Sequence, residues 1–428
     1  MSLYKLHLGD CLESMRAMPD NSVDSIVTDP PYGIRFMGKS WDGADIEARS
    51  AYRASMPSQA SNCSAKGGHK SLAAEAGKYD LTPTGMKAFQ SFTLEWASEA
   101  LRVLKPGGHL LSFSAARTYH HMAVGIEMAG FEIRDQIMWV FGSGFPKSHN
   151  LKGDHEGWGT ALKPAHEPIC MARKPLIGTV AANVLEHGTG AINIYACRVA
   201  PTGESRDRVA EASQDNRYAE SGGTNFAAKP GIRGGDPSGR WPANLIHDGS
   251  DEVRAAFPDA KGQQGKLTGS EPSGKMGSAN TYGKMDRRHA ADPRVDSDVS
   301  AARFFYCAKT SRKDRNDGLE DPGPQFKQGT TLRMVENTDT AGNNHPTVKP
   351  TDLMAYLCRL VTPVGGTVLD PFMGSGSTGK AAMREGFKFI GCELDPAYMA
   401  IAMARIEHES SKFLKKGQPE QLGIFNEK

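Results

Sequence analysis

The sequence predicts an α/β fold built on a parallel sheet with helices on both faces. Short apolar runs alternate with segments of helical periodicity over residues 1–176, and the same alternation returns after residue 345. Strands that alternate with helices form parallel sheets that are covered on both sides. The length of 428 residues fits two or three domains, or one large domain with insertions.

The first part of the chain supplies its elements in a regular order. Residues 23–28 form an apolar strand, which ends where Pro30 and Pro31 cannot donate to a sheet. Apolar residues at helical spacing predict a helix over 86–104, ended by a turn at 105–108. The elements expected next are a strand at 109–114, a helix at 118–129, a β-rich segment at 131–141 and a strand at 166–175.

Two stretches interrupt this order. Residues 38–84 are rich in Ala, Ser, Gly and Lys, which indicates a long insertion that is either functional or a plain mobile loop. Residues 201–300 hold 14 glycines and few apolar residues, so they can bury little core and are expected to be loop-rich. The α/β pattern then resumes with a helix at 351–361, a strand at 366–369, a helix at 377–385, a strand at 387–394 and a helix at 396–407.

Charge and cysteine content exclude several classes of protein. The 51 Lys and Arg nearly cancel the 49 Asp and Glu, so the net charge of +2 excludes a polycation and an acidic tail protein. None of the seven cysteines forms a CxxC pair, which argues against a metal site or a disulfide framework and favours a cytoplasmic location. No apolar stretch reaches the roughly 18 residues that span a bilayer, and the N-terminus lacks a secretory pattern.

A local basic run lies within this neutral total. Residues 303–315 carry five basic residues and one acidic residue. We expect Arg312, Lys313 and Arg315 to contact phosphate groups of a nucleic acid, since a patch can hide inside a neutral total. The alternative is a buried strand beside a solvated basic turn. Lys147 lies in a glycine-containing segment at 141–150. It is expected either to line the cleft that binds the nucleic acid or to belong to a tight connecting loop.

A glycine loop joins a strand to a helix within residues 366–380. Gly374, Gly376 and Gly379 match the G-x-G-x-x-G pattern of dinucleotide-binding loops. Glu393 ends the following strand, where an acidic residue accepts hydrogen bonds from ribose hydroxyls. The loop therefore indicates a ligand of the adenosine type. A nicotinamide dehydrogenase and a plain tight turn are the alternatives.

The same loop matches the phosphate-binding pattern G-x-x-x-x-G-K as far as Lys380. The next position must be Ser or Thr to bind Mg²⁺, and it is Ala381 here. This mismatch argues against a nucleoside triphosphatase.

Residues 29–32, Asp-Pro-Pro-Tyr, follow the first apolar strand and supply the candidate chemistry. The exocyclic amino group of a nucleobase is a poor nucleophile because its lone pair is delocalised into the ring. The carboxylate of Asp29 and the carbonyl of Pro30 can each accept one of its N–H bonds and free that lone pair. Pro30 and Pro31 fix the backbone, and Tyr32 can stack on a base taken out of the helix. Alone, this tetrapeptide could also be a chance turn.

A third motif, His-Pro-Thr-Val-Lys-Pro at 345–350, precedes the helix that leads into the glycine-loop strand. Lys349 can pair with a carboxylate, and Thr347 can donate a hydrogen bond to it. The alternative is a helix start punctuated by proline, with Thr351 and Asp352 as its cap.

Four segments carry these motifs: DPPYG (29–33), HPTVKP (345–350), DPFMGSGST (370–378) and IGCELDPAY (390–398). Together they resemble the motifs of S-adenosylmethionine-dependent DNA amino-methyltransferases. The catalytic motif precedes the cofactor loop, an order similar to the β class, in which the target-recognition region lies between the two. The resemblance implies a doubly wound, Rossmann-like methyltransferase sheet with circularly permuted motif order and an inserted, irregular recognition region.

The resemblance also implies roles for matching residues. Residues 29–32 would hold the target base, Thr347 and Lys349 the methionine carboxylate, Glu393 the ribose hydroxyls, and Asp10 would lie near the adenine. The full set expected around S-adenosylmethionine is Asp10, Asp29, Thr347, Lys349, Asp370, Phe372, Gly374, Ser375, Gly376, Thr378 and Glu393.

Asp at the first position of the tetrapeptide is typical of N6-adenine enzymes, and Ser is typical of N4-cytosine enzymes. The resemblance therefore implies methylation of the N6 amino group of a flipped adenine, with an N4-cytosine enzyme as the alternative. It implies double-stranded DNA as a partner, a homodimer, no metal and no membrane, and any restriction activity would belong to another chain.

The resemblance divides the chain into four parts. They are a catalytic half at 1–176, a target-recognition region at 177–340, a cofactor-binding half at 341–410 and a tail at 411–428.

Overall fold

The computed structural model describes most of the predicted α/β elements. It covers residues 3–32, 82–144, 148–200, 239–260, 299–309, 311–319 and 342–415, together with six short strands between these ranges. The predicted insertion at 38–84 lies almost entirely outside the described residues, as does most of 201–300. Among the described residues, no helix is long and apolar enough to cross a membrane.

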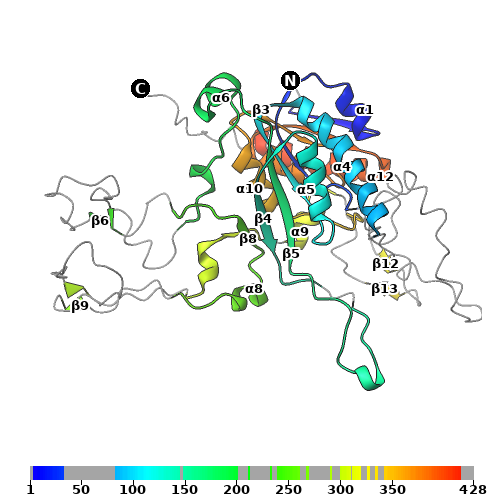
Figure 1. Ribbon diagram of the computed structural model, residues 1–428, viewed down its shortest axis with the longest axis vertical. Coiled ribbons are helices and arrows are strands. Elements are labelled where there is room, and N and C mark those ends of the chain that lie inside the picture. Colours follow the sequence, from blue (N-terminus) through cyan, green and yellow to red (C-terminus); the bar gives the residue numbers. More distant parts are fainter. Residues whose placement is uncertain are drawn as a thin grey trace, which may run out of the picture.

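A nine-stranded sheet forms the centre of the protein (Figure 1). In spatial order it runs β1 (Tyr4–Leu8), β15 (Lys388–Glu393), β14 (Thr367–Asp370), β2 (Val23–Thr28), β3 (Leu104–Phe113), β5 (His166–Arg173), β4 (Glu132–Val140), β8 (Leu245–His247) and β11 (Tyr306–Cys307). The first five strands in this order are parallel, whereas β5 is antiparallel to both of its neighbours. This confirms the predicted sheet.

The two ends of the chain build one sheet. Strands β14 and β15 come from the last part of the sequence, yet they lie between β1 and β2. Leu6 is in register with Gly391, and Ile26 is in register with Leu369. The middle of the chain also joins this sheet, since β8 and β11 extend it beyond β4.

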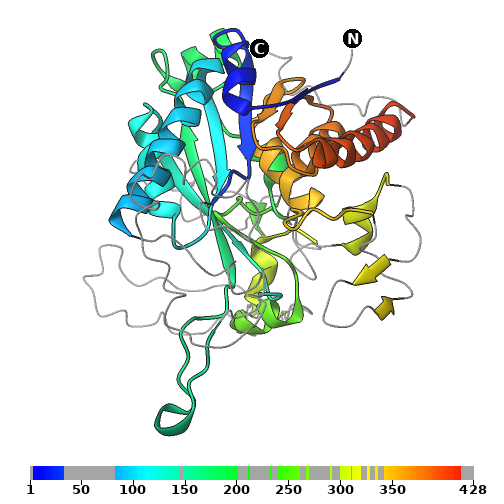
Figure 2. The ribbon, with the colours of Figure 1, turned by 90° about the vertical axis from the view of Figure 1, so that its right-hand side faces the viewer.

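Helices cover both faces of the sheet, as the turned view shows (Figure 2). One face carries α1 (Cys11–Arg16), α4 (Pro83–Val103) and α5 (Tyr119–Met128), and the other carries α10 (Thr351–Val361), α11 (Ser377–Glu385) and α12 (Pro396–Lys415). The shorter helices are α6 (Val180–His187), α8 (Asp251–Ala256) and α9 (Arg312–Asn316). The bounds of α10 and α11 agree with the predicted ones.

Helix α12 is longer than the sequence predicted, because its last two turns still contact the protein. Arg405, Glu409 and Ser410 are all buried. The helix therefore continues through residues 411–415, which the sequence assigned to a tail.

The expected turn at 105–108 is instead a bulge within strand β3. Leu104 already pairs with Val23, and the next paired residues are His109 and Ser25. Four residues of β3 thus lie opposite a single residue of β2, which bends the strand locally. Gly107 adopts a φ of 75°, a left-handed conformation that glycine adopts without strain.

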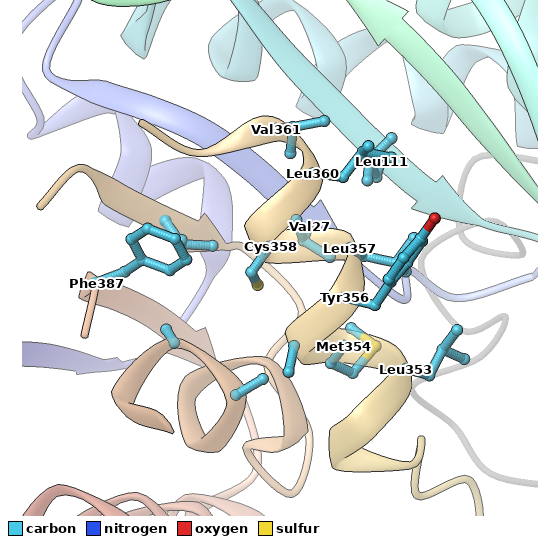
Figure 3. Close-up of a cluster of buried hydrophobic side chains, with 14 of the residues drawn as sticks. Val27, Leu111, Leu353, Met354, Tyr356, Leu357, Cys358, Leu360, Val361 and Phe387 are labelled. Carbon is cyan, nitrogen blue, oxygen red and sulfur yellow. The ribbon is translucent and has the colours of Figure 1, made fainter. Parts of the chain in front are cut away.

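Helix α10 forms the centre of the larger core (Figure 3). It lies between the sheet and α11, so almost every side chain along it is buried. Leu357 meets Val27 and Leu111 of the sheet on one side, while Cys358 faces Phe387 on the other. Most of the helix is apolar because it has neighbours on both sides, whereas Asp352 and Arg359 form ion pairs with Arg384 and Glu385 of α11.

Leu357→Ala is expected to lower the free energy of unfolding by about 2–5 kcal/mol, because Leu357 is fully buried and its truncation leaves a cavity. Chemical denaturation measures this loss. Leu185→Ala on α6 is the matched control: Leu185 is 88 % exposed, so its truncation should change stability by less than about 0.5 kcal/mol. Equal effects of the two substitutions would contradict the described core.

Candidate active site

Four neighbouring parallel strands end at one edge of the sheet, and each brings a motif residue there. Asp10 follows β1, Glu393 ends β15, Asp370 ends β14 and Asp29 follows β2. Ligands of open α/β sheets bind outside the carboxyl ends of the strands. The four carboxylates line one cavity of about 840 Å³, which is within the usual range for a ligand site.

Most of the predicted site residues line this same cavity. They are Asp10, Asp29, Pro30, Pro31, Tyr32, Thr347, Lys349, Asp370, Phe372, Gly374, Ser375, Thr378 and Glu393. Gly376 does not line it and is the N-cap residue that precedes α11. Tertiary structure therefore brings the motif at 29–32 next to the motifs at 345–350 and 370–378, which lie more than 300 residues further along the sequence.

Asp29 is held by two partners, one on each carboxylate oxygen. The hydroxyl of Tyr32 donates to Oδ1 over 2.5 Å, and the ammonium of Lys349 lies 2.9 Å from Oδ2. A carboxylate can accept about four hydrogen bonds, so Asp29 keeps acceptor capacity toward the cavity. Pro30 is buried beside it, which fixes the backbone that carries this acceptor.

Lys349 lies between two carboxylates, and this is the main departure from the sequence-based expectation. Its Nζ is 2.9 Å from Asp29 and 2.9 Å from Glu167, and it also donates to the Tyr32 hydroxyl over 3.2 Å. The Phe113 ring centre lies 4.9 Å away. The ammonium group thus has three oxygen neighbours within the protein. Burial works to lower the pKa of Lys349, but the two carboxylates outweigh burial and raise this pKa above its usual value.

Glu167 was missed by the sequence analysis, although the strand that carries it was predicted. It is the second residue of β5, in which the next five residues, 168–172, are buried and apolar. A charged residue at the cavity end of such a strand is a signal for a site. The sequence alone does not show that this glutamate belongs to the site, because its partner Lys349 is 182 residues away in the chain.

The glycines of the loop serve two different purposes. Gly374 and Gly376 have φ angles of 53° and 78°, which a side chain would strain, so they form the turn. Gly379 has no such angle, but a Cβ there would collide with Ile406 and Phe389. The first two therefore shape the cavity wall, and the third lets helix α11 pack closely.

Asp370 organises this wall from behind. It is buried and accepts hydrogen bonds from the hydroxyls of Thr28 and Thr378, both over 2.6 Å, and from the backbone N–H of Phe372 over 3.1 Å. Burial raises the pKa of Asp370 to about 6. Its carboxylate therefore fixes the ends of two strands and the start of the loop.

Glu393 occupies the position expected for a ribose contact. Its two oxygens accept hydrogen bonds from the N–H groups of Gly374 and Asp395, each over 2.8 Å. Burial raises the pKa of Glu393 to about 7. A carboxylate that is poised in this way can accept further hydrogen bonds from a diol.

An aromatic wall lies beside these carboxylates. Phe372 packs edge-on against Trp96, with ring centres 5.6 Å apart, and lies 6.2 Å from Phe92. All three rings line the cavity. Asp10 lies at the same end, where its side chain caps α1 by accepting from the N–H groups of Leu12 and Glu13.

The basic run at 303–315 has mixed roles. Arg315 donates to the backbone carbonyls of Asn343 and His345 and so holds the loop that leads into Thr347. Nε and Nη2 of Arg315 are thus engaged inside the protein, and its contact with phosphate stays a prediction. Lys313 is exposed, and its contact with phosphate stays a prediction.

Two of the predicted DNA contacts cannot be placed. The side chain of Arg312 and the whole of Lys147 lie outside the described residues.

Lys380, the lysine of the phosphate-loop pattern, faces away from the cavity. It is fully buried and pairs with Asp314 at 2.9 Å and Asp317 at 3.2 Å, both next to or within α9. A phosphate-loop lysine must reach the ligand, and Lys380 does not line the cavity. The geometry thus excludes the phosphate-loop interpretation, in agreement with Ala381.

Arg405 on α12 is a further residue that the sequence did not reveal. It is fully buried and donates to the carbonyl of Ser375 over 2.5 Å and to the hydroxyls of Ser375 and Ser377. Arg405 therefore connects α12 to the glycine loop and fixes the position of the loop. Within the part of the chain that the structure describes, no group of three or more His, Cys, Asp or Glu is placed to hold a metal ion.

Curated relatives of this chain include Type II methyltransferases. M.HindIII of Haemophilus influenzae is 26 % identical over 203 residues, which cover 44 % of this chain and 64 % of that protein. M2.DpnII of Streptococcus pneumoniae is 37 % identical over 109 residues, or 26 % and 38 % of the two chains. The DNA adenine methyltransferase YhdJ of Escherichia coli K12 is 35 % identical over 88 residues, or 20 % and 30 %. The matched part spans less than two thirds of each relative.

Among solved structures, the PvuII DNA methyltransferase, described as cytosine-N4-specific, aligns with a TM-score of 0.41 at 14 % identity, over 97 % of this chain and 94 % of that chain. The family model described as DNA methylase matches residues 23–404. That range includes the catalytic motif, the glycine loop and everything between them. The chain therefore belongs to the DNA methylase family.

Proposed function

We propose that this protein transfers a methyl group from S-adenosylmethionine to the N6 amino group of an adenine in duplex DNA. One observation carries the proposal: the Asp-Pro-Pro-Tyr acceptors and the glycine loop with Glu393 line a single cavity. Cofactor and target nitrogen must meet in one place for a direct transfer, and this cavity offers groups for both.

The residues present fit S-adenosylmethionine. Glu393 would accept hydrogen bonds from the ribose hydroxyls, and the aromatic wall at Phe372 would cover the adenine. Gly374 has no side chain, so the cofactor could approach the backbone closely. Thr347 remains available for the methionine carboxylate. When bound, S-adenosylmethionine supplies a methyl group whose bond to a positively charged sulfur breaks, with both electrons staying on sulfur, as the carbon–nitrogen bond forms.

The catalytic motif prepares the nitrogen. Asp29 and the Pro30 carbonyl accept its two N–H bonds, so the lone pair is drawn out of the base and directed toward the methyl carbon. Tyr32 and Lys349 hold Asp29 in place, so no reorganisation is needed at the moment of transfer. The methylated nitrogen then loses one proton, which Asp29 can pass to water.

The target base must leave the duplex to reach this cavity, at a cost of a few kcal/mol in lost stacking. Contacts with the surrounding DNA have to supply that energy. We assign them to the region at 177–340, which lies between the catalytic half at 1–176 and the cofactor-binding half at 341–410. A homodimer on double-stranded DNA is part of the same proposal.

Adenine is preferred over cytosine because the first residue of the tetrapeptide is Asp29. The relative named as a DNA adenine methyltransferase supports this choice. The test is long-read sequencing of unmethylated DNA after incubation with the purified protein and S-adenosylmethionine. N6-methyladenine at one recurring sequence is the expected result, N4-methylcytosine would select the alternative, and unmodified DNA would contradict the proposal.

Asp29→Ala is expected to reduce methylation at least about 10³-fold, because the acceptor of the target N–H bond is removed. Binding of S-adenosylmethionine, measured by calorimetry, should persist and weaken by no more than about tenfold, through the loss of one nearby negative charge. Asp20→Ala is the control, since Asp20 is an exposed residue that pairs with Arg102. Full activity of Asp29→Ala would contradict the catalytic assignment.

Cofactor affinity is expected to rise between pH 6 and pH 8. The pKa of Glu393 is about 7, so only about one tenth of this carboxyl is ionised at pH 6, and the ribose hydroxyls need the ionised form. The dissociation constant should fall roughly tenfold over this range, and Glu393→Gln should abolish the dependence. A dependence that survives in Glu393→Gln and centres near pH 6 would instead identify Asp370 as the titrating group.

Lys313→Gln is expected to weaken DNA binding by a similar factor on every sequence. The slope of log K against log salt concentration should fall by about one, because one ion fewer is released on binding. Fluorescence anisotropy at several salt concentrations measures both effects. Lys388→Gln is the matched control, because Lys388 is exposed at the opposite edge of the sheet, where β15 begins. An unchanged salt slope in Lys313→Gln would remove this residue from the DNA interface.

A further inference from the structure

Glu167 is a carboxylate in the cavity wall to which the proposed reaction gives no task. Its side chain is 25 % exposed, and its partner in the structure is Lys349, at 2.9 Å. It lies opposite Trp139 in the pairing of β5 with β4, so the sheet fixes its position. Truncation of Glu167 would leave Lys349 with Asp29 as its one carboxylate partner.

The three side chains have an unbalanced charge. Asp29 and Glu167 each carry one negative charge, and Lys349 carries one positive charge, so the cluster holds a net charge of −1. Lys349 is 7 % exposed and Asp29 is 19 % exposed. Arg117 and Lys163 line the same cavity but are exposed, so water screens their charges more strongly.

A net negative cluster favours a cation in the adjacent space. The methyl donor in the proposed function carries a positive charge on sulfur, whereas its product, S-adenosylhomocysteine, has a neutral sulfur. The nitrogen that Asp29 holds must lie next to the transferred methyl group. The charged sulfur is therefore brought close to this cluster. Its charge and its methyl group distinguish the donor from the spent product, and the charge is the property that a carboxylate can recognise.

We propose that Glu167 is a specificity-determining residue that makes the cavity prefer the sulfonium cofactor over its neutral product. Asp29 and Lys349 alone would cancel, and Glu167 restores one negative charge. This inference rests on the proposed function, because it requires S-adenosylmethionine as the methyl donor. It assigns Glu167 an electrostatic role in addition to its contact with Lys349.

Calorimetric titration of the DNA-free protein with each of the two ligands tests the inference without any catalytic turnover. Glu167→Gln keeps the shape and an acceptor oxygen for Lys349 but removes the charge. We expect its affinity for S-adenosylmethionine to fall about tenfold, as one charge at short range predicts at an intermediate dielectric constant. Its affinity for S-adenosylhomocysteine should change less than about twofold, so the ratio of the two constants falls.

Two further variants complete the design. Glu167→Asp keeps the charge and should retain most of the preference for the cation. Glu132→Gln is the matched control: Glu132 pairs with Arg173 at 2.6 Å at the other end of the same two strands, so its neutralisation should leave the ratio unchanged. Thermal unfolding of each variant shows whether it is folded, and Glu167→Asp provides the comparison if Glu167→Gln unfolds.

Each outcome decides a separate point. If Glu167→Gln lowers the affinities for both ligands equally, Glu167 only positions Lys349, and the inference is overturned. If neither affinity changes, the inference is also overturned. Loss of the preference in Glu167→Asp to the same extent as in Glu167→Gln would also overturn it, because the charge is retained there. If the unmodified protein binds neither ligand, the proposed function itself fails.

Discussion

Parallel pairing of β14 with β2 and β15 is the constraint on which the site depends. It places two strands from the end of the chain between two strands from its beginning. Because parallel strands end at the same edge, Asp29, Asp370 and Glu393 are forced to one side of the sheet. The cavity is a consequence of this pairing, and the loops around it only complete the walls.

Hydrogen bonds and ion pairs of buried or half-buried basic side chains keep that edge in shape. Arg405 donates to the carbonyl of Ser375 in the glycine loop, and Lys380 on α11 pairs with Asp314 on α9. Arg315, beside Asp314, holds the loop before Thr347. Charges that are removed from water are costly unless they are fully paired, so these contacts define one arrangement of the loops and disfavour the others.

The site itself combines a rigid acceptor with a surplus of negative charge. Asp29 is fixed from two directions, by Tyr32 and Lys349, and this is what a hydrogen-bond acceptor needs if it is to act without rearrangement. Glu167 joins the same contacts from β5, the strand that runs against its neighbours. One lysine thus links the strand that carries the catalytic motif with the antiparallel part of the sheet.

The sequence by itself determined the order of the strands and helices from β2 to β5 and from α10 to α12, the bounds of α10 and α11, and the motif residues around the cavity, because periodicity, proline and glycine act over short distances. It misjudged the bulge at 105–108, and it did not reveal the internal contacts of Arg315, Glu167 or Arg405. Those features depend on partners far away in the chain: Val23 for the bulge, His345 for Arg315, Lys349 for Glu167 and Ser375 for Arg405. Only the tertiary structure decides which charged side chains meet, since their pairing follows from the packing of strands and helices and leaves no local pattern.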